Sequence, residues 1–181
     1  MRIKSALILI MAIVLVSDTL GQVRTEGTAK EPTDDPLKPL LFLVGEWKGQ
    51  GKGPYGPFDT EGRFERRGRW LLYTEEVFVP GTRQRIHVST WVYGHDEKGG
   101  LLCYLFDTAG VFRFAGRKEA DGVVAFHWSE GSDWRRFRFE RQPDASVRSR
   151  YEAHLPSQSE RFPGYPDATF EGVMRPKSKV N

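Results

Sequence analysis

The sequence LKPLLFLVGEWKGQGKG, residues 37–53, changes abruptly from a helical to an extended pattern. Its first part has apolar residues at the i, i+3, i+4 and i+7 positions of one helix face, namely Leu37, Leu40, Leu41 and Val44. The run stops at Gly45, a residue type that commonly ends helices. A strand follows from Trp47, with glycine at positions 49, 51 and 53. We expect a short helix that plugs the mouth of a β-barrel, and glycines that permit close packing and tight coiling where the barrel closes.

Strand patterning continues from Trp47 to about Arg175, interrupted by glycine-containing turn dipeptides. The pattern predicts strands at residues 46–53, 58–66, 69–79, 83–93, 101–107, 111–118, 123–129, 133–141, 146–153 and 168–175. Most links are of hairpin length, and closing the sheet on itself removes exposed edges. A two-sheet sandwich is the competing fold, but it usually contains longer crossovers. We therefore expect an all-β fold, a single antiparallel up-and-down β-barrel of about ten strands.

The barrel domain is expected to span residues 36–177. A polar segment without apolar periodicity precedes it at residues 22–35 and predicts a disordered linker, and residues 178–181 form a short disordered tail. One internal link is long: residues 154–167, HLPSQSERFPGYPD, are rich in Pro and Ser. A lid over the barrel mouth and a surface excursion both fit this composition, and we favour the excursion.

The N-terminal residues 1–21 resemble a secretory signal peptide. Arg2 and Lys4 supply a positively charged start, residues 6–16 form an unbroken apolar run, and small residues near Gly21 suit cleavage. The apolar run is shorter than the roughly 20 residues that a spanning helix needs. We expect an exported protein, periplasmic or secreted, with no transmembrane segment after signal cleavage.

Charge and cysteine content argue against several classes of function. The chain has a formal net charge of +3, and loss of Arg2, Lys4 and Asp18 with the signal removes two positive charges and one negative charge, which leaves +2. This balance argues against nucleic acid as a partner, and the Arg-aromatic clusters GRFERRGRW and DWRRFRFERQ also contain acidic residues, as solvated strand faces do. Cys103 is the only cysteine, so the fold has no internal disulfide, and its apolar flanks predict a buried thiol.

The first strand and the end of the last strand carry a resemblance to known barrels. Gly45-Glu46-Trp47, together with Arg175, resembles the calycin and lipocalin arrangement. The resemblance implies that the Trp47 ring packs under a closing Arg175. Over residues 37–177 the chain is similar to an uncharacterised bacterial lipocalin-like family, through GEWKGQGKG and YGHDEKGGLLCYLFDTAG. That family implies a fold but no settled activity.

The first strand is also similar to that of nitrobindin-like haem barrels, because residues 47–51, WKGQG, match their Trp-x-Gly-x-Gly motif. Those proteins place a haem-ligating histidine about seven residues before a terminal arginine. That spacing falls on Ala168 here, and no histidine follows residue 154. A haem barrel with redox or isomerase activity would need His127 or His87 as its ligand instead.

Hairpin closure predicts which side chains face one another across two strands. Closing one hairpin between Phe78 and Arg83 gives three pairs: Trp70 with Trp91, Thr74 with His87, and Glu76 with Arg85. The last pair is expected to be a structural ion pair.

Two further hairpins, closed at Phe106–Val111 and at Lys118–Val123, predict an apolar inner face. The expected pairs are Cys103 with Phe114, Leu105 with Phe112, and Phe114 with His127. The inner face then contains Cys103, Leu105, Phe112, Phe114 and His127, and the opposite face contains Tyr104, Arg113 and Trp128. A shift of one residue would invert the assignment.

Motifs of catalysis and of metal binding are absent from the sequence. It contains no Gly-x-Ser-x-Gly, no P-loop and no His-Glu-x-x-His, and its four histidines form no closely spaced ligand pair. Glu75 and Glu76 point to opposite faces of one strand, so they cannot share acid–base work. We expect no metal site and no catalytic residues.

Aromatic residues are abundant, with five Trp, six Tyr and twelve Phe. A barrel of this size can enclose one small ligand, which predicts an exported, non-catalytic binding module for a small apolar or amphipathic molecule. The candidate ligand-binding residues are Cys103, Leu105, Phe112, Phe114, His127, His87 and Trp91. Three alternatives stay open: a barrel whose aromatics fill the interior, a haem barrel, and an envelope domain that binds other proteins through its strand surfaces.

Overall fold

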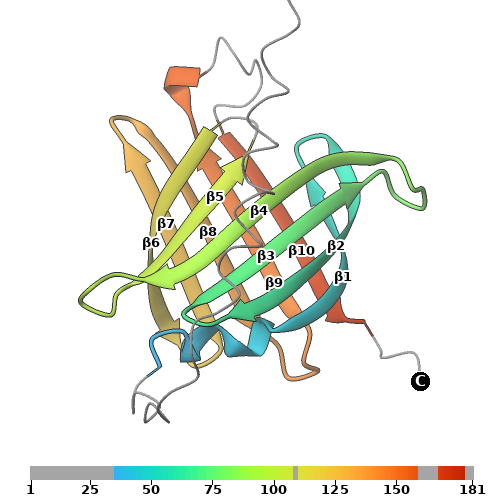
Figure 1. Cartoon of the computed structure of the whole chain (residues 1–181). Helices are drawn as coiled ribbons and strands as arrows, with labels where there is room; N and C mark the ends of the chain where they lie inside the picture. Colours follow the sequence, from blue (N-terminus) through green and yellow to red (C-terminus); the bar gives the residue numbers. More distant parts are fainter. Residues whose placement is uncertain (1–34, 108–109, 159–166, 178–181) are drawn as a thin grey trace, which may run out of the picture. The chain divides into compact units, whose positions relative to one another are not determined.

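The computed structural model describes residues 35–107, 110–158 and 167–177. In these residues ten strands form one closed antiparallel barrel, in which each strand pairs with its sequence neighbours and β1 pairs with β10 (Figure 1). The strands are β1 (Gly45–Gly53), β2 (Gly56–Arg67), β3 (Trp70–Phe78), β4 (Arg85–His95), β5 (Leu101–Asp107), β6 (Gly110–Ala120), β7 (Val123–Glu130), β8 (Asp133–Arg141), β9 (Val147–His154) and β10 (Asp167–Pro176). The predicted up-and-down barrel is confirmed, and the sandwich is not formed.

Several predicted segments lie outside the described residues: the signal peptide at 1–21, all but the last residue of the linker at 22–35, the tail at 178–181, and most of the long loop. Of that loop, Pro156–Gln158 form the short 3₁₀ helix η2. No helix among the described residues is long and apolar enough to cross a membrane.

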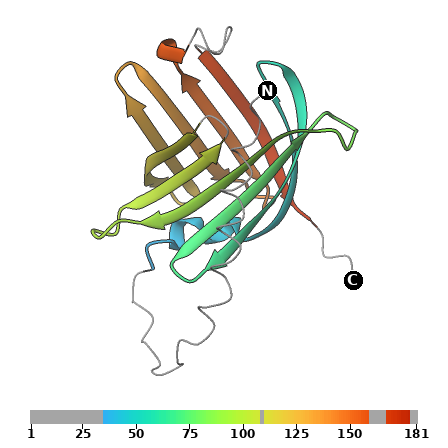
Figure 2. The same ribbon diagram turned by 45° about the horizontal axis from the view of Figure 1, so that its top comes forward.

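A 3₁₀ helix, η1 (Lys38–Leu43), packs into one end of the barrel, at the lower side of the views in Figure 1 and Figure 2. Its buried residues are Leu40 and Leu43, with Leu37 just before it. Leu41 and Val44, expected on the same face, are instead 36% and 46% exposed. The reason is periodicity: a 3₁₀ helix has three residues per turn, so positions 37, 40 and 43 align, whereas the expected spacing was that of an α-helix.

The half of the interior next to η1 is filled by side chains. The Trp47 indole N–H donates a 2.6 Å hydrogen bond to the carbonyl oxygen of Leu43, which ties β1 to η1. Aromatic rings occupy the centre, with Phe64 stacked on Tyr73 at 3.8 Å between ring centroids. The other buried members of this core include Leu71, Tyr93, Cys103, Phe114, Phe126, Phe137, Phe139, Val147 and Met174.

Glycines in β1 make room for large neighbours, as the sequence predicted. A Cβ on Gly51 would lie 2.4 Å from the Cζ atom of Phe58, and a Cβ on Gly53 would lie 2.5 Å from Cδ1 of Phe170. Gly45, which begins the strand, has a φ of +135°, a backbone conformation that favours glycine. The strand therefore needs glycine for space at its far end and for conformation at its start.

The predicted register of β3 and β4 is wrong. The structure pairs Tyr73 with Trp91 and Val77 with His87, three residues away from the expected pairing. The connection is wider than a tight hairpin, because Val79 N–H donates to the Gln84 carbonyl, and the ladder contains an irregularity at Val77/Phe78. The ion pair between Glu76 and Arg85 nevertheless forms.

The register of β5 and β6 is confirmed, with Cys103 opposite Phe114 and Leu105 opposite Phe112. The register of β6 and β7 is wrong by one residue, because a bulge lies between Lys118 and Ala120 and brings Ala115 opposite His127. His127 is therefore exposed on the outer face, and Trp128, expected outside, packs against the interior. A one-residue slip inverts the face of every side chain that follows it.

Candidate functional site

The end of the barrel interior away from η1 is less shielded from solvent than the end next to it. There, several inward-facing side chains keep partial contact with solvent: Glu75, His87, Trp91, Trp128, Tyr151 and Phe170. Buried residues of the same layers are Thr60, Ser89, Leu105, Phe112 and Arg135. We call this set the distal half. Its polar side chains are sheltered but reachable, which is the usual character of a small-molecule site.

Glu75 on β3 is the acidic group of the distal half. Thr60 donates a 2.9 Å hydrogen bond from Oγ1 to Oε1 of Glu75, and Ser89 donates from Oγ to Oε2 at 3.4 Å. The Trp91 indole N–H donates to Ser89 Oγ at 2.9 Å, which extends this chain of hydrogen bonds. Strands β2, β3 and β4 thus build one polar wall.

The pKa of the Glu75 carboxyl is raised, because burial disfavours the carboxylate more than its hydrogen bonds and the charge of His87 favour it. The side chain nevertheless keeps partial exposure, so it lies deep in the barrel and borders accessible space. A protonated carboxyl can donate a hydrogen bond as well as accept one.

Arg135 on β8 is the basic group of the distal half and is only 4% exposed. Its guanidinium carbon lies 3.8 Å from the centre of the Phe112 ring and 5.8 Å from that of Trp128, so both rings contact the cation through their faces. Phe112 and Trp128 meet edge to face at 5.3 Å. Strands β6, β7 and β8 thus build a wall of aromatic rings around a positive charge.

The polar wall and the aromatic wall lie on opposite sides of the barrel. In the closed order of ten strands, β3 and β8 are separated by four strands in either direction. Among the described residues, no ion pair includes Glu75 or Arg135. The two charged groups therefore face the interior from opposite walls without joining each other.

The sequence prediction missed Glu75 and Arg135, although strand alternation contains the signal. Glu75 shares its face with Leu71 and Tyr73, and Arg135 shares its face with Phe137, all of them buried or inward. The predicted β3–β4 register was wrong by three residues, and an odd shift assigns Glu75 to the opposite face. The many arginines of β8 suggested a solvated face for Arg135.

Six of the seven predicted ligand-binding residues face the interior: Cys103, Leu105, Phe112, Phe114, His87 and Trp91. Cys103 and Phe114 belong to the filled half, and burial raises the pKa of the Cys103 thiol, which makes it unreactive. His127 is excluded from the interior by the β6 bulge.

Arg175 does not cover Trp47. It is exposed on the outer face of β10 opposite Lys48, whereas its neighbour Met174 faces inward. The expectation taken from the lipocalin resemblance is therefore wrong for Arg175. Trp47 is buried in the barrel end by η1 instead.

The position of the haem ligand in nitrobindin-like barrels carries no ligating side chain here. Ala168, at the expected ligand position, is 2% exposed and lies on the inner face, where its methyl group cannot ligate iron. Of the two substitutes, His127 is on the outer face, whereas His87 faces the interior and is half-buried. Among the residues that the structure describes, no three His, Cys, Asp or Glu side chains are grouped for a metal ion.

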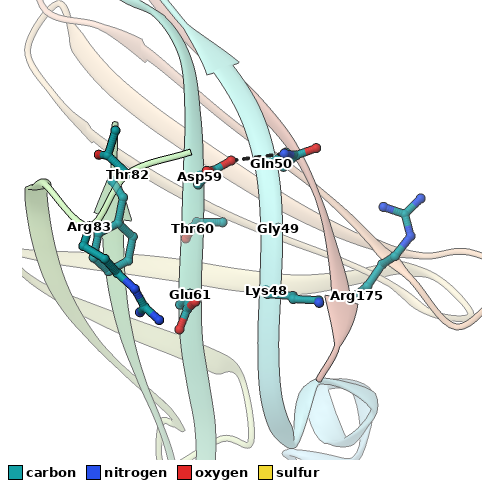
Figure 3. A pocket seen from close by; sticks show the side chains of 10 residues that line it. Lys48, Gly49, Gln50, Asp59, Thr60, Glu61, Thr82, Arg83 and Arg175 are labelled. Carbon is teal, nitrogen blue, oxygen red and sulfur yellow. Dashed lines mark hydrogen bonds between the residues drawn. The ribbon is translucent and has the colours of Figure 1, made fainter. Parts of the chain in front are cut away.

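A pocket lies on the outer face of β1 and β2 near the β3–β4 connection (Figure 3). Its acidic groups already have partners: Asp59 accepts a hydrogen bond from the Gln50 amide at 3.2 Å, and Glu61 accepts one at 2.7 Å from Lys177, which lies outside the pocket lining. Figure 3 shows Arg83 and Arg175 on opposite sides of this pocket. The charged side chains of this pocket are exposed or half-buried, and they lie apart from one another. The distal half, whose polar groups are more deeply buried, is therefore the stronger candidate site.

Comparisons with known proteins support the fold and nothing finer. No protein-family model matches the chain, and no curated protein matches it. The solved structure of Rv2717c from M. tuberculosis is similar to it with a TM-score of 0.56 and 17% identity, over 78% of this chain and 97% of that one. An S-type phycobiliprotein lyase, CPES from Guillardia theta, aligns with a TM-score of 0.48 and 13% identity, over 76% of this chain and 90% of that one. The likeness to Rv2717c supports the fold alone, a closed antiparallel β-barrel.

Proposed function

We propose that this chain is a non-catalytic binding protein that holds one small amphipathic molecule in the distal half of its barrel. The observation that supports the proposal is the contrast between the two halves of one interior. Next to η1, inward side chains such as Phe126 are sealed, whereas Glu75, Trp91 and Trp128 face inward and still contact solvent. Inward groups that contact solvent at one end are what a ligand entering from that end requires.

The chemistry of the two walls favours an amphipathic occupant over a wholly apolar one. Trp91, Trp128 and Phe112 offer ring surface to an apolar body. Glu75 and Arg135 offer hydrogen bonds and charge that orient a polar end. Sites of this kind combine mostly apolar lining with a few polar groups that fix orientation.

Export is part of the proposal, and its support is the signal-like sequence at residues 1–21. Expression of the full chain, followed by mass measurement of the protein recovered outside the cytoplasm, tests it. A mature mass that begins near residue 22 is expected. Recovery of the intact chain from the cytoplasm alone would contradict export.

Native mass spectrometry of the purified mature protein tests binding directly. We expect a stoichiometric adduct that disappears under denaturing conditions, and its mass identifies the class of molecule.

Titration with the neutral apolar probe N-phenyl-1-naphthylamine provides a second readout. A Trp128→Ala variant should bind the probe more weakly, whereas Trp134→Ala, on the adjacent outer face of β8 and stacked on His154, should bind it as the unchanged protein does. Absence of both an adduct and saturable probe binding would overturn the proposal.

A further inference from the structure

Arg135 is a buried cation whose environment does not neutralise it. It is 4% exposed, and its Nε atom is buried and has no hydrogen-bond partner among the residues that the structure describes. A charge removed from water is strongly destabilising unless it is paired. Two other arginines of β8, Arg136 and Arg138, meet this requirement at the outer face, where both pair with Glu119. Arg135 points the other way, and no acidic residue within 35–107, 110–158 or 167–177 forms an ion pair with it.

The nearest acidic residue on the same strand, Asp133, is already engaged. Ser157 donates to it from its backbone N–H at 3.0 Å and from its hydroxyl group. These hydrogen bonds are the main reason why the pKa of Asp133 is lowered, and the charge of Arg135 is its weakest cause. Asp133 therefore reduces the positive potential around Arg135 without making a hydrogen bond to the guanidinium group.

The rings around Arg135 position the guanidinium group but do not replace an anion. Phe112, at 3.8 Å, covers one face of its plane, and Trp128 lies further out at 5.8 Å. A guanidinium group held by one face still presents its N–H groups along its edge, in a fork that matches the two oxygens of a carboxylate. The structure thus contains a fixed, buried donor fork beside apolar ring surface.

The other charges in the distal half favour a singly charged anion. Glu75 on the opposite wall and Asp133 beside Arg135 are both acidic, so a dianion such as a phosphate monoester would meet more repulsion than a carboxylate. The raised pKa of Glu75 makes its carboxyl compatible with a monoanion across the barrel.

We infer that Arg135 binds the carboxylate group of an amphipathic carboxylic acid, and that the apolar body of this ligand lies in the distal half between the aromatic wall and Trp91. The inference rests on the proposed function and specifies its ligand class. The ligand carboxylate then supplies the hydrogen-bond acceptor for Arg135, and its negative charge compensates the buried positive charge of the guanidinium group.

The experiment compares four matched ligands on the mature protein by isothermal titration calorimetry: dodecanoate, 1-dodecanol, dodecylammonium and dodecyl phosphate. Dodecanoate should bind most tightly, by about 10- to 100-fold over dodecanol. Arg135→Gln should remove this preference, so that dodecanoate and dodecanol bind with similar affinity. Arg135→Lys, which keeps the charge and loses the fork, should restore part of the preference. The control Arg136→Gln, one residue along β8 on the outer face, should behave as the unchanged protein.

The outcomes separate this inference from the proposed function. If dodecanol and dodecanoate bind equally, or if Arg135→Gln retains the preference, the barrel binds ligands but Arg135 is not the anion site. Tighter binding of dodecyl phosphate than of dodecanoate overturns the carboxylate class. If none of the four ligands and no N-phenyl-1-naphthylamine binds, the proposed function itself fails. The comparison on the unchanged protein decides the ligand class even if Arg135→Gln does not fold.

Discussion

Gly53 occupies a position on β1 where the neighbouring strand leaves no room for a side chain. A Cβ at this position would lie 2.5 Å from Cδ1 and 2.7 Å from Cε1 of Phe170, and 3.4 Å from Cγ of the same ring. Carbon atoms in good contact are separated by about 3.5 to 4.0 Å. All three nearest atoms belong to Phe170, so the steric conflict in Gly53→Ala is with one ring alone.

The magnitude follows from two opposing effects. Forcing an extra carbon into a packed position destabilises a protein by about 1–3 kcal/mol. Alanine in place of glycine in a strand, where space exists, is favourable by roughly 0.5–1 kcal/mol. We therefore expect Gly53→Ala to lower the free energy of unfolding by about 1–2 kcal/mol in the unchanged protein, and to be neutral or stabilising in a Phe170→Ala background.

A double-mutant cycle measured by urea unfolding tests this reasoning. The single variants, the double variant and the unchanged protein give a coupling energy, which should be about 2 kcal/mol. The thermal midpoint should fall by about 3 °C for each kcal/mol lost. Lys52→Ala, an exposed neighbour on the outer face of the same strand, serves as control and should change stability by less than about 0.5 kcal/mol. Equal effects of Gly53→Ala in both backgrounds would refute the role of Phe170.

Three further predictions concern the interior. Burial raises the pKa of Glu75 above its ordinary value of 4.5, so the folded protein binds this proton more tightly than the unfolded chain does, and stability falls as pH rises from 4.5 through the raised value. Glu75→Gln should flatten this fall when the free energy of urea unfolding is measured from about pH 4 to pH 8. An unaltered pH dependence of stability in Glu75→Gln would contradict the assignment. Phe126→Ala removes a ring stacked on Phe137 at 4.7 Å and should cost about 3–5 kcal/mol in urea unfolding, whereas Phe106→Ala, at a 46% exposed ring, should cost far less. Cys103, fully buried with a raised pKa, should react with a thiol reagent such as dithionitrobenzoate only as fast as the protein unfolds, and rapid reaction of the folded protein would show that the thiol is accessible.

Local patterns in the sequence predicted the fold because each depends on residues close together in the chain. Alternating polarity and glycine-containing turns located the strands. The tight connection between β5 and β6 also predicted the pairing of Cys103 with Phe114. Tight turns restrict register strongly, since only a few backbone geometries connect two paired strands.

Where a connection widens or a strand bulges, local pattern no longer determines register. The bulge between Lys118 and Ala120 sent His127 outward and Trp128 inward, and the wider β3–β4 connection shifted that hairpin by three residues. Nothing in the sequence near these points marks the extra residue, because a bulge is stabilised by contacts with the completed sheet.

Local sequence pattern is enough to predict the architecture: an up-and-down barrel with a short helix at one end and glycines on its first strand. The content of the interior depends on the folded barrel. Glu75 on β3 and Arg135 on β8 are 60 positions apart in the chain, and they share an interior only because β1 pairs with β10 and closes the ring. Closure brings every strand's inner face around one space, and this non-local step creates the site.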